Sequence, residues 1–256
     1  MTQVTDRISN SDIVDLAKKQ FELTKKQKIP TVVVNLSSKG LIYPESHPLR
    51  KGYVHMRHMC AYDEDILIND TYMNKGITFD VLLAELITDD IDISDIAIVD
   101  REGLIINCYI LGFGADYTIV ASDPKTNNTI TRDINLNNLL TKNFDLVSDK
   151  NGEFSYTVNA ETTIKFRYIT MDHENLDESK VISSFLHKCI TEVNGDRSIA
   201  AIEDFLRYNF SPGDSRKFRK YYTDNAPGLQ TEIELKGEDG DTFQTGFRFN
   251  TAVFWT

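Results

Sequence analysis

The sequence predicts an α+β protein in which a mostly helical body carries a small antiparallel β insertion and a C-terminal β-hairpin. Three observations predict this class. Apolar residues recur at helical spacing on both sides of the chain's middle, while the middle itself alternates short apolar strands with turn residues. The end of the chain alternates apolar and polar residues around Asp239-Gly240, as a hairpin does. With 256 residues, the chain can bury a core without a disulfide or metal.

These patterns divide the chain into an N-terminal helix or arm (1–29), a helical body with short strands (30–116), a β-rich subdomain (117–172), a helical segment (173–228) and a C-terminal hairpin with its tail (229–256). In the first stretch, Ser11 and Asp12 can cap a helix that runs to about Lys25. Its apolar stripe is narrow, so the helix either docks on a partner or lies on the surface.

The body begins with buried strands at 31–34 and 53–59 and continues as helices at 61–68 and 79–87. A third helix runs from about Ser94 to Leu111 and is apolar on most sides, so we expect it at the centre of the core. Gly112-Phe113-Gly114 ends it.

The β-rich subdomain holds two hairpins, 118–120 with 129–131 and 154–158 with 164–168. Helices return with Ile182, Leu186 and Ile190 on one face, until Asn194-Gly195 breaks the run. Asp214 can cap a last, basic helix that Pro227-Gly228 terminates. The closing hairpin presents the side chains of Phe243, Phe247 and Phe249 on one face of its return strand.

The amino-acid composition indicates which classes of partner to expect. Acidic residues outnumber basic ones 39 to 28, giving a net charge of −11 with no basic stripe of the kind that binds phosphates, so nucleic acid is not an expected partner. The N-terminus is polar, and the longest apolar runs fall short of the roughly 20 residues that span a membrane, so we expect a cytosolic protein. Cys60, Cys108 and Cys189 lie far apart, as small buried hydrophobic residues of a reducing compartment do.

The search for chemistry predicts no catalytic residue, no cofactor and no metal. His55 and His58 would point to opposite faces of a strand and so cannot share a metal. The acidic run of Asp89, Asp90, Asp92 and Asp95 lacks the glycine and distal glutamate of a calcium loop, and is expected to be a solvated cap-and-loop cluster. A remote alternative is a hydrolase that uses Asp63 and Glu64 with His58.

Two segments are candidates for protein–protein contact. The first is the basic helix 215–222, which is either a plain surface helix or a docking site for an acidic partner. The second is the C-terminal pair of large apolar residues, which either tucks into the parent core or inserts into another subunit. The candidate contact residues are Arg216, Lys217, Phe218, Arg219, Lys220, Phe254 and Trp255.

Several segments, taken in order from about Val34 to the C-terminus, resemble the T4-like bacteriophage baseplate hub protein family. They are Leu36-Ser37-Ser38-Lys39-Gly40-Leu41-Ile42-Tyr43-Pro44, Met56-Arg57-His58-Met59-Cys60-Ala61-Tyr62-Asp63-Glu64-Asp65-Ile66-Leu67, Gly76-Ile77-Thr78-Phe79-Asp80-Val81-Leu82-Leu83, Ile110-Leu111-Gly112-Phe113-Gly114-Ala115-Asp116-Tyr117, Asp214-Ser215-Arg216-Lys217-Phe218-Arg219, Ala226-Pro227-Gly228 and Phe254-Trp255. Each motif is weak alone, and their colinear order carries the resemblance.

The resemblance implies a non-enzymatic hub subunit or hub assembly protein of a contractile tail, working among hub, spike and tape-measure proteins. It implies assembly in the host cytoplasm and, for a structural subunit, a place in the virion baseplate. A tape-measure or tail assembly chaperone that is absent from the mature virion is the alternative, and a homo-oligomer is left open. Relatives carry a Cys-x-x-Cys zinc knuckle in the C-terminal hairpin, whereas Gly237-Glu238-Asp239-Gly240 stands here and no cysteine follows Cys189, which excludes zinc at that turn.

Overall fold

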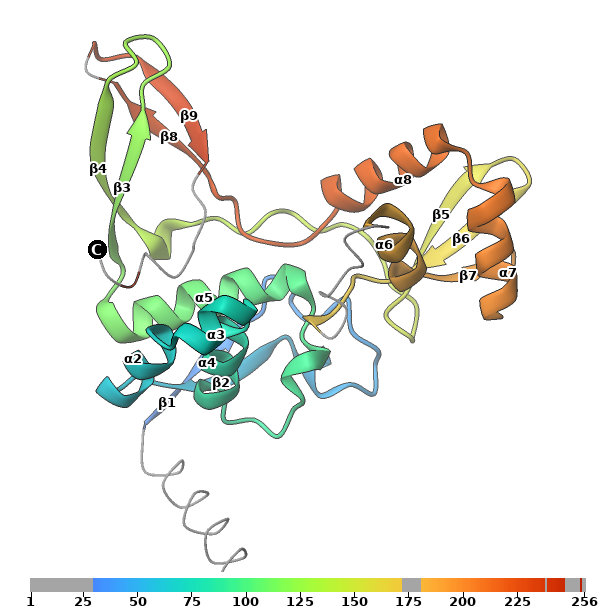
Figure 1. Ribbon diagram of the computed structural model, residues 1–256, viewed down its shortest axis with the longest axis horizontal. Helices are drawn as coiled ribbons and strands as arrows, with labels where there is room; N and C mark the ends of the chain where they lie inside the picture. The colour runs from blue at the N-terminus through green and yellow to red at the C-terminus, as the bar shows by residue number, and fades with distance from the viewer. Residues whose placement is uncertain (1–29, 172–180, 238, 247–253, 255–256) are drawn as a thin grey trace, which may run out of the picture.

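The computed structural model describes residues 30–171, 181–237, 239–246 and 254 (Figure 1). The helix expected within 1–29 and the expected roles of Phe247, Phe249 and Trp255 fall outside these residues. The described strands form four small antiparallel sheets, one of three strands and three of two. They divide among a body, a projecting pair of hairpins and a second lobe (Figure 1).

The body is built around the long helix α5 (Ile98–Phe113). Its other elements are β1 (Thr31–Asn35), η1 (Pro48–Lys51), β2 (Tyr53–Arg57), α2 (Ala61–Leu67), α3 (Asp70–Lys75), α4 (Thr78–Leu86) and η2 (Ile93–Asp95). Strands β1 and β2 pair antiparallel, with buried Val34 opposite buried Val54. Because α5 buries residues on several sides, including Leu104, Ile106 and Cys108, the prediction of a central helix is confirmed.

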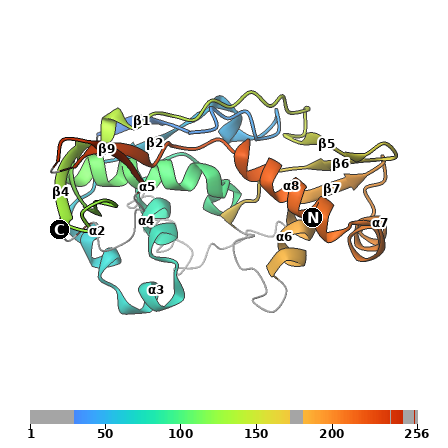
Figure 2. The same ribbon diagram turned by 90° about the horizontal axis from the view of Figure 1, so that it is seen from above.

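Two hairpins form what we call the tower: β3 (Asp116–Ser122) with β4 (Thr129–Asn135), and β8 (Glu232–Lys236) with β9 (Thr242–Gly246). A short 3-10 turn, η3 (Leu136–Asn138), follows β4. Far apart in sequence, the hairpins lie side by side (Figures 1 and 2), and Figure 1 shows them standing away from the body. They share a small core of their own, made of Ile119, Ala121, Ile130 and Leu235. At its base, Tyr117 of β3 and Ile134 of β4 also pack against the main core.

The lobe contains β5 (Phe154–Asn159), β6 (Thr162–Phe166), α6 (Val181–Cys189), β7 (Ile190–Val193), α7 (Ile199–Asp204), the π-helical turn η5 (Phe205–Asn209) and α8 (Pro212–Asp224). Its sheet has the order β5-β6-β7. Backbone hydrogen bonds join the lobe to the body, because Ile98 N–H donates to the Ile169 carbonyl at 3.0 Å and Met171 N–H donates to the Ile96 carbonyl at 2.9 Å. The body and lobe share one continuous hydrophobic core.

The predicted mostly helical body with one β insertion is wrong, because strands from the beginning, middle and end of the chain build sheets in all three parts. Both central hairpins and the C-terminal hairpin form as the alternation predicts. The sequence analysis missed β7. Ile190 was expected on a helical face with Ile182 and Leu186, but it pairs with Phe166 in the lobe sheet instead.

Candidate interaction surface

Helix α8 carries most of the predicted contact residues. Pro212 occupies its first turn, and the N-cap is Ser211, not the predicted Asp214. The Asp214 N–H donates to Ser211 Oγ at 3.1 Å, and the Ser211 hydroxyl donates to the Asp214 carboxylate at 2.7 Å. This Ser-x-x-Asp arrangement is a capping-box signature that the sequence already displays. It fixes the start of α8 and therefore which side chains face outward.

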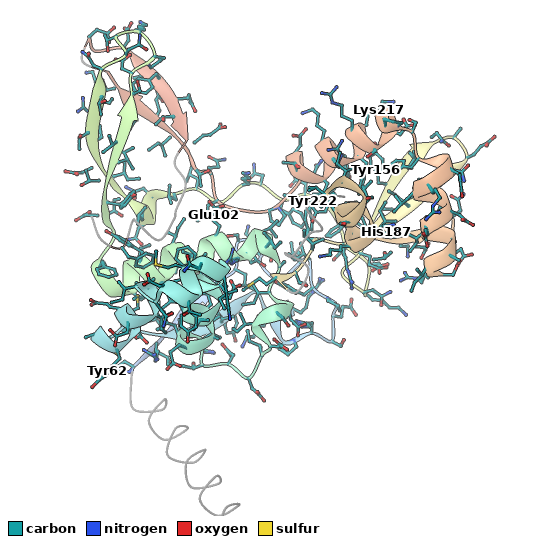
Figure 3. All side chains as sticks on the ribbon, in the orientation of Figure 1. Tyr62, Glu102, Tyr156, His187, Lys217 and Tyr222 are labelled. Atoms are coloured by element: carbon teal, nitrogen blue, oxygen red, sulfur yellow. The ribbon has the colours of Figure 1, made fainter. Side chains whose placement is uncertain are left out.

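The inner face of α8 is buried on the lobe sheet. Phe218 is fully buried, with its ring centroid 5.4 Å from that of Phe166 and 5.3 Å from that of Tyr156. Figure 3 places Tyr156 and Tyr222 on the inner side of the helix and Lys217 on its outer side. The Phe218 side chain is therefore core packing and is not available to a partner.

The outer face presents a basic stripe, which we define as Arg216, Arg219 and Lys220. These residues follow the i, i+3, i+4 spacing of one helical face and line a shallow hollow with Thr223 and Asp224. Lys220 pairs with Asp224 at 2.7 Å within the helix. Arg216 and Arg219 have no ion pair among the residues that the structure describes, and the buried Nε of Arg219 has no hydrogen-bond partner there. The stripe can accept carboxylates, for which guanidinium groups are suited geometrically.

Lys217 lies off the stripe. It pairs with Asp214 at 3.2 Å, and the hydrogen bond from the Ser211 hydroxyl, followed by that from Lys217, holds the pKa of Asp214 below its ordinary value. Lys217 is thus a cation of the same helix whose charge is already balanced locally.

The other predicted contact, Phe254, is buried in the chain's own core. Its ring lies 5.5 Å from Tyr109, 5.6 Å from Phe113 and 5.9 Å from Phe79, measured between centroids. Of the two alternatives for this residue, the structure thus has Phe254 tucked into the parent core.

Two of the three groups named for a hydrolase, Asp63 and His58, are engaged in internal contacts. Both oxygens of Asp63 accept hydrogen bonds of 2.7 Å from the Arg57 guanidinium, which also reaches Glu85 at 3.0 Å. Burial alone would raise the pKa of Asp63, but Arg57 and the Cys60 N–H outweigh it and hold this pKa below its ordinary value. His58 lies elsewhere, with Nδ1 3.1 Å from the Leu111 carbonyl. The described residues do not bring Asp63 and His58 together as an acid–base pair.

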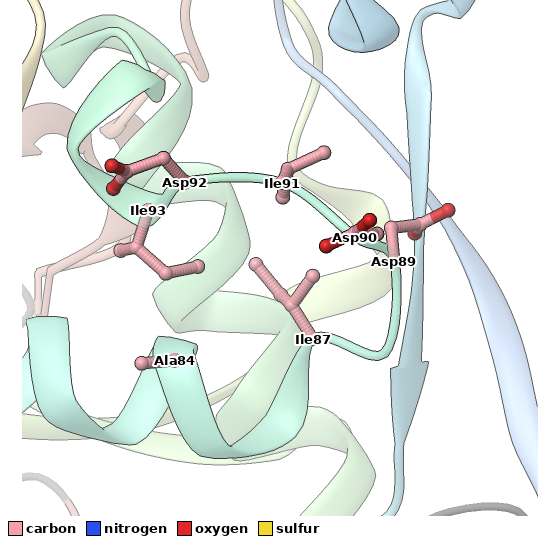
Figure 4. A pocket seen from close by; sticks show the side chains of 7 residues that line it. All are labelled: Ala84, Ile87, Asp89, Asp90, Ile91, Asp92 and Ile93. Atoms are coloured by element: carbon pink, nitrogen blue, oxygen red, sulfur yellow. The ribbon is translucent and has the colours of Figure 1, made fainter. Parts of the chain in front are cut away.

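The acidic loop after α4 behaves largely as cap and surface residues. Asp92 caps η2 by accepting from Ser94 N–H at 2.9 Å, and Asp89 accepts from Lys51 at 2.6 Å and contacts His55 Nδ1 at 3.1 Å. Figure 4 shows Asp89, Asp90 and Asp92 around a hollow floored by isoleucines. In the part of the chain that is described, no group of three or more histidine, cysteine or acidic side chains could hold a metal.

A buried carboxylate at Asp100 was missed by the sequence analysis. Asp100 accepts from the Ser38 N–H and hydroxyl, both at 2.7 Å, and from the Tyr43 hydroxyl at 2.8 Å. Burial raises the pKa of Asp100, and these hydrogen bonds oppose the rise. An acidic residue in the first turn of an otherwise apolar helix was the available signal. The network fixes the segment between β1 and η1 onto α5.

Comparison with known proteins gives one match. A family model described as T4 bacteriophage base plate protein matches residues 45–245. No curated protein and no solved structure matches the chain. Among the described helices, none is both long and apolar enough to cross a membrane. Because the matched residues cover well over half of the sequence, the chain belongs to the T4 bacteriophage base plate protein family.

Proposed function

We propose that this protein is a non-enzymatic component or assembly factor of the central hub of a T4-like baseplate, and that it acts by binding neighbouring hub, spike or tape-measure proteins. The family match over residues 45–245 carries the baseplate part of this proposal. The colinear hub-like motifs support the hub in particular. On this proposal the protein acts in the host cytoplasm during assembly and, as a structural subunit, would reside in the virion baseplate.

The engagement of the candidate acids supports a non-enzymatic role. A general acid or base must reach the proton that it transfers. Asp63, one of the acids that the hydrolase alternative needs, is almost fully buried and has both oxygens occupied by Arg57. Its charge therefore serves to join β2 to α2, and chemistry at this position would require that ion pair to break.

The basic stripe supports binding of an acidic partner. Arginines are enriched at the energetic centres of protein interfaces, and here two of them stand without a local counter-ion among the described residues of an acidic chain. Electrostatic attraction of this kind accelerates association and orients the partners. We therefore place the principal contact with a neighbouring baseplate protein on the outer face of α8.

The proposal is tested by quantitative mass spectrometry of purified phage particles and of infected-cell lysate, with copies of this chain counted per tail. A small, fixed copy number in the particle is the expected result for a hub subunit. Abundance in the lysate with none in the particle would contradict the structural role and favour the chaperone that leaves after assembly. A tagged chain pulled down from that lysate would then be examined for the tape-measure protein.

A further inference from the structure

An extended segment with an open edge connects the tower to the lobe. Just after η3, Gln230 N–H donates to the Leu140 carbonyl at 2.8 Å and Lys142 N–H donates to the Gly228 carbonyl at 2.9 Å, so Thr141 stands opposite Leu229 in an antiparallel bridge. The ladder stops there because the Gly228 N–H does not donate back to Lys142 and the next donor in register, the Ala226 N–H, donates to the Thr223 carbonyl at 3.2 Å instead. The chain beyond Lys142 therefore continues without a ladder partner.

Residues 143–148 stay extended although no second strand pairs with them. They contain no turn or bend, and exposed and half-buried residues alternate along them as in a strand with one face on a core. Phe144 packs on the core side, 5.7 Å from Phe154 and 6.1 Å from Tyr168 between ring centroids. At the far end, the Ser148 hydroxyl donates to the Leu41 carbonyl at 2.6 Å. The strand is thus held straight before any partner arrives.

The direction of its backbone groups follows from the ladder. In a strand, the N–H and C=O of alternate residues point to opposite edges. Leu140 and Lys142 point toward Leu229, so the backbone groups of the intervening odd-numbered residues point the other way. We call these groups, from Thr141, Asn143, Asp145 and Val147, the open edge. None of them has a hydrogen-bond partner among the described residues.

The open edge is accessible. Val147 is 89% exposed, and Asn143 and Asp145 are exposed as well. Figure 2 shows this connecting segment along the outer margin of the molecule, between η3 and β5. An unpaired row of backbone donors and acceptors is a template for another strand, and folded proteins normally cover or interrupt such rows.

We propose that the open edge pairs with the open edge of a second copy of this chain, antiparallel and about a two-fold axis. In the register that uses the whole edge, Thr141 lies opposite Val147 of the second copy and Asn143 lies opposite Asp145 of the second copy. All four N–H groups and all four C=O groups of each copy then find partners. A two-fold interface uses the same patch on both copies, which a single antiparallel edge supplies by itself.

The side chains suit this register. Two β-branched residues, Thr141 and Val147, meet across the strands, which is a favourable cross-strand pair. The Asn143 amide meets the Asp145 carboxylate, so a donor faces an acceptor and no like charges are opposed. Shifting the centre to Asp145 would set that carboxylate against itself, and like charges directly opposite destabilise a sheet. The full-overlap register is therefore the favoured one.

The full-length protein tests this directly by sedimentation equilibrium and amide hydrogen exchange over about 1–200 μM, the range in which a micromolar dimer forms. We expect a monomer–dimer equilibrium in which the amides of Asn143, Asp145 and Val147 exchange at least about tenfold more slowly at the high concentration. Because each copy carries a charge of −11, the dimer should strengthen as salt is added. A monomer at every concentration, or a dimer with unchanged exchange at these amides, would overturn the proposal.

Matched variants test the edge and the register. Val147→Pro removes one N–H from each copy and should weaken the dimer by at least about tenfold, because two interface hydrogen bonds are lost. Val147→Thr keeps the N–H and the branched shape and should dimerise like the parent. Asn143→Asp should weaken the dimer by opposing two carboxylates, and adding Asp145→Asn should restore it. Equal dimerisation by Val147→Pro and Val147→Thr, or no effect of Asn143→Asp, contradicts the proposed pairing.

Discussion

The Tyr43 hydroxyl donates a hydrogen bond of 2.8 Å to the Asp100 carboxylate and accepts one of 3.0 Å from the Ala97 N–H at the start of α5. One side chain from the loop after β1 thus satisfies both a buried charge and a helix N-terminal amide. Burial and the Asp100 charge raise the pKa of Tyr43 well above its ordinary value, so this hydroxyl keeps its proton and stays a donor.

Tyr43→Phe should therefore lower the free energy of unfolding by about 1–3 kcal/mol, because it removes the hydrogen-bond partner of the Ala97 N–H and leaves the Asp100 Oδ2 with only the Ser38 hydroxyl. Urea unfolding followed by circular dichroism measures the change. Tyr53→Phe is the matched control, since Tyr53 is only half-buried and its hydroxyl has no hydrogen bond among the described residues. Equal stabilities for the two variants would contradict the assigned role of Tyr43.

Removing one partner of the Arg57–Asp63 pair should lower the free energy of unfolding more than removing both partners. Arg57→Met leaves the buried Asp63 carboxylate without its ion-pair partner, and we expect the free energy of unfolding to fall by roughly 3–5 kcal/mol. The double variant Arg57→Met with Asp63→Leu should recover much of this loss. Chemical denaturation of the single and double variants measures the difference. Additive losses in the double variant would show that the two side chains are not coupled.

The same ion pair predicts acid sensitivity. Because the pKa of Asp63 is lower in the folded protein than its usual 3.8, the pair contributes stability above the unfolded pKa. That contribution is lost as pH falls through the folded pKa, since the folded state then takes up the proton. Asp63→Asn should thus flatten the fall in stability between about pH 5 and pH 2, measured as unfolding free energy against pH. An unchanged slope would be evidence against this assignment.

Phe254 should behave as a core residue even though it lies close to the C-terminus. Phe254→Ala removes a ring that is 4% exposed and touches Tyr109 and Phe113, so we expect a loss of about 3 kcal/mol. Tyr62→Ala is the control, because Tyr62 is 84% exposed and should change stability little. Thermal and urea unfolding measure the stabilities of the two variants.

Charge reversal should separate binding from folding on α8. Arg216→Glu with Lys220→Glu should leave the unfolding curve nearly unchanged and reduce incorporation into particles or into complexes with a neighbouring protein, because the stripe then repels acidic groups. Lys217→Glu, compared with Arg216→Glu alone, makes the same change of charge on the same helix away from the stripe. Complementation of a phage that lacks the gene reports incorporation, and equal incorporation of both variants would remove the stripe from the proposal.

Periodicity predicted the elements whose patterns are local. The strand at 31–34, the helix after Ala61 and the central helix α5 all stand where their apolar spacing put them. The strand β7 could not be seen this way, because Ile190 continues the helical spacing of the preceding residues. Only its pairing with Phe166, which is a tertiary contact, turns the backbone into a strand.

The candidate surface could be predicted in part. The run of cations in α8 indicates a basic segment, but it does not by itself separate the outward-facing residues from the buried ones. The spacing of Ser215, Phe218 and Tyr222 at i, i+3 and i+7 already indicates a buried face, and it would have removed Phe218 from the contact residues. The open edge has no local signal at all. It depends on Leu229 pairing with Thr141 and on the Ala226 N–H donating to Thr223, which leaves the next position of that ladder without a donor.

The hub assignment is tested most directly by cross-linking mass spectrometry on purified baseplates, or on hub assembly intermediates isolated from infected cells. Lysine-reactive cross-linkers reach Lys217 and Lys220, which are exposed on α8 beside and within the basic stripe. We expect cross-links from these lysines to hub, spike or tape-measure proteins. Cross-links from α8 only to proteins of the baseplate periphery would contradict it.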